Sequence, residues 1–215
     1  TANVGVTVNG VNDAPTVFNL NGDSFSYNEG AGAQLLDQGG DATVTDVDSS
    51  DFDTGQLTVS IVSGGDSGED ALGVDTSGSV TFDGTNLGVG GTGIGTVNGG
   101  NNGTGGNPLT FDLNASATPA LLSTVIRALT YTNTDTDNPT TGARTVRLTV
   151  SDGDTGTSGN NDVTVTVQGV NDVAVLNNLS GDRLNYTEDA AASVIDQGTA
   201  ATVTDVDSAD FDSGF

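Results

Sequence analysis

Apolar and polar residues alternate in short runs along most of the chain. Leu57, Val59 and Ile61 form the clearest run, with polar residues between them. A period of two places successive side chains on opposite faces, so each run is predicted to be a strand with one buried face. Similar runs begin at or contain Val4, Phe25, Ala42, Val80, Leu109, Tyr131, Val146 and Val163. Short strands between Gly-rich turns are typical of sandwiches, and we predict an all-β antiparallel β-sandwich of about eight strands.

One stretch has a helical period instead. Thr118 is a favourable N-cap residue, and Pro119 suits the first position of a helix. The apolar residues that follow at helical spacing are Leu121, Leu122, Val125, Ile126 and Leu129. We therefore predict one short α-helix over residues 118–129.

Residues 83–107 are dominated by Gly, with Asn and Thr. Such a segment offers little to bury, and ordering glycine costs much backbone entropy. We predict a long flexible loop without strands, the most mobile part of the complete repeat. A calcium-binding glycine repeat is disfavoured here, because no Asp lies between Gly84 and Pro108.

An acidic segment of the chain occurs twice. Residues 45–49 read Thr-Asp-Val-Asp-Ser and recur at 204–208, which is 159 positions further on. The same offset relates Tyr27 to Tyr186 and many other pairs. An internal repeat defines the architecture, so we predict a tandem array. The predicted divisions are the last strand of a preceding repeat at 1–11, a complete repeat at 12–170 and the first part of the next repeat at 171–215.

The charge of the chain narrows the classes of partner. The formal net charge is −25, and the four positive side chains are all arginines. Such a surface repels phosphate backbones and anionic lipids, so we expect neither nucleic-acid nor membrane binding. It attracts divalent cations instead.

The composition also excludes several catalytic mechanisms. The chain has no His and no Cys, which excludes His-based triads and thiol catalysis. Two carboxylates acting on a glycosidic bond remain an alternative. Because the acidic residues recur at a fixed period, a repeated structural role is favoured. We predict that the protein is not an enzyme.

Asp46 and Asp48 have the spacing of cation ligands. In extended backbone, residues two apart project to one face, where both carboxylates can reach one ion. Ca²⁺ takes six to eight oxygen ligands, and two close carboxylates repel each other unless a cation lies between them. The alternative is that both are solvated turn residues.

Other acidic or amide residues stand where loops are expected to gather. Glu29 and Asp152 lie at the ends of predicted strands, and Asn12 and Asp13 lie in the linker before the complete repeat. A ligand in the linker would tie two modules together. Weaker candidates are Asp51, Asp53 and Asp154.

The ordered motifs resemble a known family. They are Tyr-x-Glu at 27–29, Val-Thr-Asp-Val-Asp-Ser at 44–49, Leu-Thr-Val-Ser-Ile at 57–61, Val-Ser-Asp-Gly at 150–153 and Val-Thr-Val-x-Gly-Val-Asn-Asp-Ala-Pro at 6–15. Together they resemble cadherin-like repeats, in particular those of giant secreted bacterial adhesins of the repeats-in-toxin type. The resemblance implies an Ig/cadherin-like sandwich in tandem array.

The resemblance also implies a set of Ca²⁺ ligands. By position they are Asn12, Asp13, Glu29, Asp46, Asp48, Asp152, Asn171, Asp172, Glu188, Asp205 and Asp207. The Asp-Arg-Glu motif of animal cadherins has no counterpart here, although Asp135 and Asp137 are alternatives. The second linker lacks the Ala-Pro that follows Asp13.

The expected function follows from the resemblance. It is that of a calcium-rigidified extender repeat of a large adhesin on the bacterial cell surface, which projects a distal binding domain. Its expected partners are neighbouring repeats of the same chain, joined by calcium junctions, with a cell-surface or carbohydrate ligand elsewhere in the parent protein. The alternatives are a carbohydrate- or surface-binding module, and a repeat appended to a secreted hydrolase.

Overall fold

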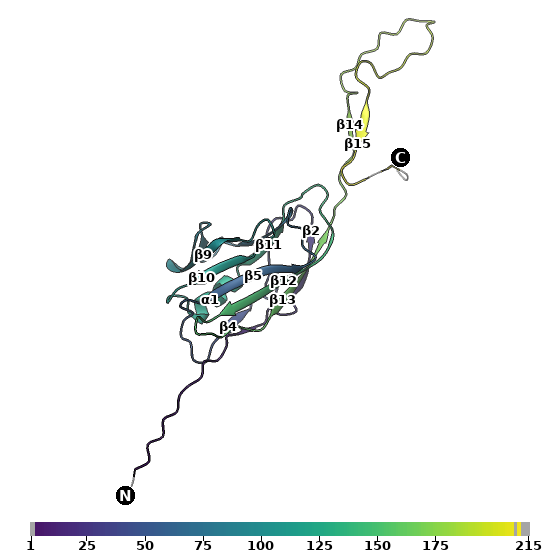
Figure 1. The fold of residues 1–215 in the computed structure, drawn as a ribbon. Coiled ribbons are helices and arrows are strands. Elements are labelled where there is room, and N and C mark those ends of the chain that lie inside the picture. The colour runs from purple at the N-terminus through teal and green to yellow at the C-terminus, as the bar shows by residue number, and fades with distance from the viewer. Residues whose placement is uncertain (1–2, 209, 212–215) are drawn as a thin grey trace. The chain divides into compact units, whose positions relative to one another are not determined.

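The computed structural model describes residues 3–208 and 210–211 (Figure 1). The chain divides into two compact units, residues 1–168 and 169–215. The elements of the first unit are β1 (Thr16–Phe18), β2 (Ser24–Asn28), β3 (Gln34–Leu35), β4 (Thr43–Thr45), β5 (Gln56–Ser63), β6 (Asp70–Val74), β7 (Val80–Phe82), β8 (Asn86–Val89), β9 (Thr92–Asn102), β10 (Leu109–Leu113), α1 (Pro119–Ile126), β11 (Leu129–Asn133), β12 (Gly142–Ser151) and β13 (Asn161–Gln168). The second unit contains β14 (Val175–Asn177) and β15 (Thr202–Thr204).

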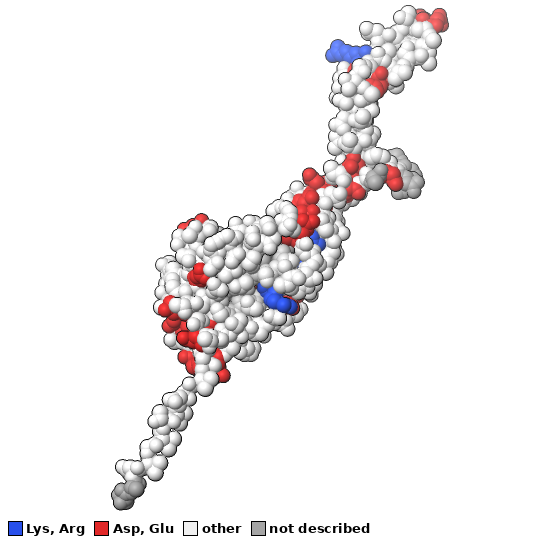
Figure 2. Space-filling model, viewed as in Figure 1, with Lys and Arg blue, Asp and Glu red and all other residues white. Residues whose placement is uncertain are grey.

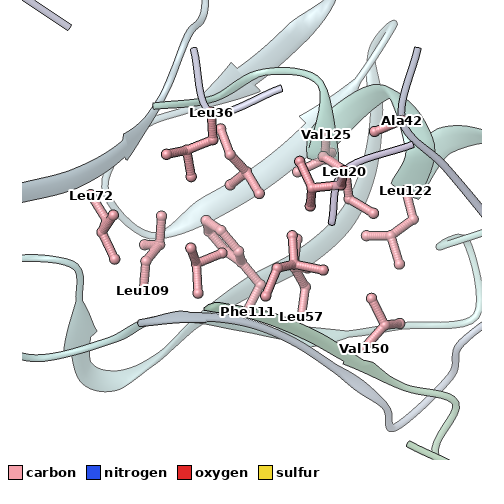
Figure 3. Packing of buried hydrophobic residues seen from close by; sticks show 14 of the residues in the cluster. Leu20, Leu36, Ala42, Leu57, Leu72, Leu109, Phe111, Leu122, Val125 and Val150 are labelled. Atoms are coloured by element: carbon pink, nitrogen blue, oxygen red, sulfur yellow. The ribbon is translucent and has the colours of Figure 1, made fainter. Parts of the chain in front are cut away.

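The first unit is an all-β sandwich with one short helix, as predicted. Its large sheet has the order β2-β13-β12-β5-β10-β9-β8-β7. Opposite it lie the sheet β3-β11-β6, the pair β1-β4 and α1. The paired strands named here are antiparallel except β2 and β13, which run parallel with Tyr27 opposite Val167. The core lies between these layers, where Leu57 and Phe111 face Leu36 and Leu122 (Figure 3).

The alternation along the central strands gives the sandwich its inner face. In β12, Val146, Leu148 and Val150 are buried, whereas Arg147 and Thr149 between them are partly exposed. Burying one such apolar side chain contributes about 1.5–3 kcal/mol relative to leaving it in water. The hydrophobic pattern therefore sets which face of each strand turns inward.

The helix begins as predicted and ends earlier than predicted. Thr118 Oγ1 accepts a hydrogen bond from the backbone N–H of Leu121 at 3.4 Å. The helix ends at Ile126, because the chain turns after Arg127 and Leu129 already belongs to β11. This helix is not long or apolar enough to cross a membrane, and the described residues contain no other candidate span.

The prediction of a structureless glycine loop is wrong. Residues 83–107 contain β8 and β9, which form an antiparallel hairpin. Gly90 and Gly91 make the turn, with φ of +58° and +86°. Leu87, Val89 and Ile94 are buried in the core. The apolar residues of this segment are few, but they suffice to anchor the hairpin.

The glycines of this hairpin serve close packing. A Cβ atom on Gly95 would lie 2.5 Å from the carbonyl oxygen of Asp112 on the neighbouring strand. A Cβ atom on Gly103 would lie 2.4 Å from the carbonyl oxygen of Leu72. Glycine inside a strand can mark a close approach of another backbone, and that is its role here.

Residues 3–11 are extended and pair with no other described strand. Val4 is 87% exposed, although its sequence pattern is that of a half-buried strand. A strand needs a partner for its backbone hydrogen bonds and for its apolar face. Its assignment to a preceding repeat stays a prediction.

The strand pair of the second unit, β14-β15, repeats the pair β1-β4 of the first unit. Leu176 pairs with Val203 as Val17 pairs with Val44, at an offset of 159 positions. The burial differs, because Val44 is 2% exposed and Val203 is 51% exposed. The strand pair forms in both units, whereas Val44 is buried with the help of α1, where Ser123 Oγ accepts from its N–H.

Candidate metal centre

Acidic side chains gather at the end of the first unit where residues 12–15 enter it (Figure 2). Asp46 and Asp48 follow β4, and Asp152 follows β12. β4 and β12 belong to different layers, so segments far apart in the sequence place these carboxylates at one end of the sandwich. The sequence alone indicated that loops gather here, but not which carboxylates would touch.

Two hydrogen bonds hold the linker against this end. Asn12 Nδ2 donates to Asp152 Oδ2 at 2.8 Å. The backbone N–H of Asp13 donates to Asp48 Oδ2 at 3.1 Å. Both linker residues on the predicted ligand list therefore contact predicted ligands of the same repeat.

Asp152 is buried and fully engaged in this contact. Its Oδ1 accepts from the backbone N–H of Asp154 at 2.7 Å and of Gly156 at 2.9 Å. A Cβ atom on Gly156 would lie 2.1 Å from Asp152 Oδ2, so only glycine fits beside it. Asp152 thus positions Asn12 and shapes its own loop.

Asp46 and Asp48 form a pair in which one carboxylate oxygen, Asp46 Oδ2, accepts no hydrogen bond. Asp46 Oδ1 accepts from the backbone N–H of Asp48 at 3.1 Å and of Ser49 at 3.0 Å. Asp46 Oδ2 is buried and finds no hydrogen-bond donor among the described residues. A buried oxygen without a donor is costly unless something else binds it.

The surroundings of Asp48 have opposing effects on its pKa. The hydrogen bond from the Asp13 N–H lowers the pKa of Asp48, but desolvation and the neighbouring carboxylates of Asp46 and Asp13 raise it above its ordinary value. Carboxylates that approach this closely disfavour joint ionisation. A cation at this place would relieve the repulsion.

The same geometry occurs in the second unit. Asp205 Oδ1 accepts from the backbone N–H of Ser208 at 3.0 Å and of Asp207 at 3.3 Å. The N–H of Asp172 donates to Asp207 Oδ2 at 3.2 Å. A hydrogen bond from Asp207 lowers the pKa of Asp205. The contacts of Asp205 are local, whereas the contact of Asp172 joins residues 35 positions apart, as does that of Asp13 with Asp48 in the first unit.

Glu29 lies at the other end of the first unit. Its backbone N–H donates to the carbonyl of Gln168 at the end of β13. β12 runs antiparallel to β13, so about ten residues of strand, on the order of 30 Å, separate that end from Asp152. The structure therefore does not bring Glu29 to Asp46 and Asp48. Its role as a Ca²⁺ ligand stays a prediction.

The remaining candidates are placed in loops. Asn171 Nδ2 donates to the carbonyl of Asp172, and Glu188 lies in an exposed loop. Asp135 Oδ1 accepts from the N–H of Asp137 at 3.0 Å, and Asp51 Oδ1 accepts from that of Asp53 at 3.2 Å. These contacts are those of ordinary Asx turns.

The residues at the linker end fit a cation only in part. Within the described ranges, no group of three or more Asp, Glu, His or Cys side chains is already arranged around a metal position. The oxygens of Asp152, both oxygens of Asp48 and one oxygen of Asp46 accept hydrogen bonds from N–H groups. Asp46 Oδ2 is the oxygen that remains buried without a donor.

Sequence reasoning missed a buried charged network at the Glu29 end of the sandwich. Arg144 Nε lies 3.2 Å from Asp70 Oδ2, and both side chains are buried. Tyr131 OH and Asn133 Nδ2 donate to Asp70 Oδ1. Burial and the Asp70 carboxylate raise the pKa of Tyr131. The sequence does contain an indication of this network. Arg144 lies two positions before the inward-facing Val146 of β12, so the strand period places its side chain on the buried face.

The fold and these contacts define an all-β sandwich protein. Comparisons with protein-family models, with curated proteins and with solved structures gave no match.

Proposed function

We propose that the first unit is a calcium-rigidified extender repeat of a large bacterial cell-surface adhesin, outside the cell, which projects a distal binding domain. The observation that carries this proposal is the docking of the linker onto the acidic loops, by Asn12 to Asp152 and by Asp13 to Asp48. The recurrence of the second contact in the second unit supports a role repeated along a tandem array.

Asp13, Asp46 and Asp48 would hold the ion in this proposal. Bound Ca²⁺ supplies positive charge that several oxygen ligands share. Asp46 offers its buried Oδ2, and the linker contributes Asp13. Asp152 is a positioning residue in this proposal. Its hydrogen bond to Asn12 fixes where the linker enters the first unit. In this way the same carboxylates that repel one another would join linker and module.

The proposed role is mechanical and not catalytic. A tether needs the direction of the linker to be maintained, and two hydrogen bonds at a partly exposed surface contribute only about 0.5–1.5 kcal/mol each, or somewhat more where a charge is involved. Occupation of a site at about 10 times its dissociation constant adds about 1.4 kcal/mol. Calcium would therefore change the linker from loosely to firmly held.

The test compares the intact chain in millimolar Ca²⁺ with the chain in excess chelator. Extracellular sites bind Ca²⁺ at about 10⁻⁴ to 10⁻³ M. Chelation is therefore expected to lower the melting temperature and to increase amide hydrogen exchange of residues 12–14. The variant Asp46→Ala with Asp48→Ala is expected to remove this response from residues 12–14. Asp135→Ala with Asp137→Ala is the control with the same charge change, and it should retain the response. Identical melting and exchange with and without Ca²⁺ would refute the proposal.

A further inference from the structure

A cavity of about 310 Å³ opens on the first unit between the loop after β5 and the end of β9. Its polar lining includes Asp66, Ser67 and Asn107, and its apolar lining includes Ile61, Val62 and Leu72. The cavity lies beside the start of β12, at the opposite end of that strand from Asp152. It is therefore separate from the candidate metal centre.

Glycines shape the wall of this cavity. A Cβ atom on Gly65 would lie 2.7 Å from Ile61 Cγ2, and one on Gly106 would lie 2.9 Å from Ser67 Cβ. Gly106 also has a φ of +79°, which other residues rarely adopt. Both glycines therefore allow a close approach within the lining that a larger residue would push apart. The shape of the hollow thus depends on glycines of two segments, the loop after β5 and the end of the glycine-rich segment.

The buried carboxylate at the cavity, that of Asp70, is already neutralised. Asp70 in its wall accepts hydrogen bonds from Tyr131, Asn133 and the N–H of Asp66, and it pairs with Arg144. No Lys or Arg is among the lining residues. An anionic ligand would meet acidic groups without a cation, and a metal ion would find Asp70 fully engaged.

Asp66 is the group that remains available. Its Oδ1 accepts from the N–H of Gly68 at 2.9 Å, and its Oδ2 accepts from Thr140 Oγ1 at 3.0 Å. These two hydrogen bonds lower its pKa, so the carboxylate is charged at neutral pH. Each oxygen can still accept a second hydrogen bond. Asn107 Nδ2 donates to the carbonyl of Thr104, which leaves its side-chain oxygen to accept.

We infer that this cavity binds a neutral sugar, one monosaccharide unit in size. Hydroxyl groups of the sugar donate to Asp66 and Asn107, and its C–H face packs against Ile61, Val62 and Leu72. The lining thus combines apolar side chains with convergent polar groups, which suits a ligand that has both a C–H face and hydroxyl groups. Sugar acids and phosphates are excluded because the lining has carboxylates and no Lys or Arg.

The inference is independent of calcium. The experiment is a ¹⁵N-edited NMR titration of the intact chain with glucose, galactose and N-acetylglucosamine, each alone, in the presence of chelator. At least one sugar is expected to give saturable shifts of the amide signals of Gly65, Gly106 and Asn107. N-acetylneuraminic acid, an anionic sugar, should give no such shifts.

Variants separate binding at this cavity from weak contacts elsewhere. Asp66→Asn keeps the shape of the side chain but removes its charge, and a lost hydrogen bond to a charged group should weaken affinity about 10-fold or more. Asp41→Asn has the same charge change at an exposed position outside the cavity lining and should bind like the wild type. The absence of saturable shifts with all three neutral sugars would overturn the inference. Equal affinities of the Asp66 and Asp41 variants would overturn it as well.

Discussion

The side-chain amide of Asn12 and the buried carboxylate of Asp152 are joined by a 2.8 Å hydrogen bond, although 140 positions separate them in the sequence. The linker is thereby part of the folded unit that it enters. This contact makes the loop after β12 a determinant of how the chain approaches the sandwich.

Asp152→Ala should destabilise the first unit by about 1–3 kcal/mol, because the N–H groups of Asp154 and Gly156 lose their acceptor inside a compact loop. Chemical denaturation measures the change. Asp154→Ala, at an exposed position two residues on, should stay within about 0.5 kcal/mol of the wild type. Equal effects of the two substitutions would show that Asp152 does not hold this loop.

Gly95→Ala should destabilise the protein by about 1–3 kcal/mol, since its Cβ atom would press on the carbonyl oxygen of Asp112 and overpack the sheet. Gly93→Ala is the control, because that position on β9 has open space and an ordinary backbone conformation. The control should be neutral or slightly stabilising. If both variants melted like the wild type, the hairpin of β8 and β9 would not be packed as described.

Arg144→Met should be the most destabilising of these substitutions, at about 3–5 kcal/mol, because it leaves the buried Asp70 without its cation. Arg147→Met breaks an ion pair at the surface. The side chain of Arg147 is 34% exposed and that of its partner Asp162 is 35% exposed. That exposed pair should contribute about 1 kcal/mol or less. The free energies of unfolding of the two variants test the difference, and a larger loss for Arg147 would contradict it.

Asp48→Asn should raise the melting temperature slightly in chelator at pH 7. Its pKa in the fold lies above the ordinary value of 3.8, so the folded state favours the neutral form that Asn imitates. As the pH falls through the raised folded pKa, the wild type binds this proton and gains stability, so its difference from the variant should shrink. Melting curves between pH 7 and pH 4 follow this difference. If the difference in melting temperature grew as the pH fell, a raised pKa of Asp48 in the folded state would be contradicted.

Local features of the molecule could be predicted from the sequence. Strand faces follow the alternation of Val146, Leu148 and Val150, and the start of α1 follows Thr118 and Pro119. The turn around Asp46 and its copy around Asp205 have the same hydrogen bonds. Each depends on residues within a few positions of one another, and so a short sequence suffices to specify it.

Long-range features were decided only by the tertiary structure. Tyr27 and Tyr186 occupy equivalent positions in a repeated sequence, yet Tyr27 is 0% exposed and Tyr186 is 57% exposed. Tyr27 lies on β2, which pairs in parallel with β13, and its ring packs edge-on against Tyr131. The pairing of Arg144 with Asp70, 74 positions apart, likewise needed distant strands to meet. Burial depends on which segments pack together, and the hydrophobic pattern of one segment does not contain that information.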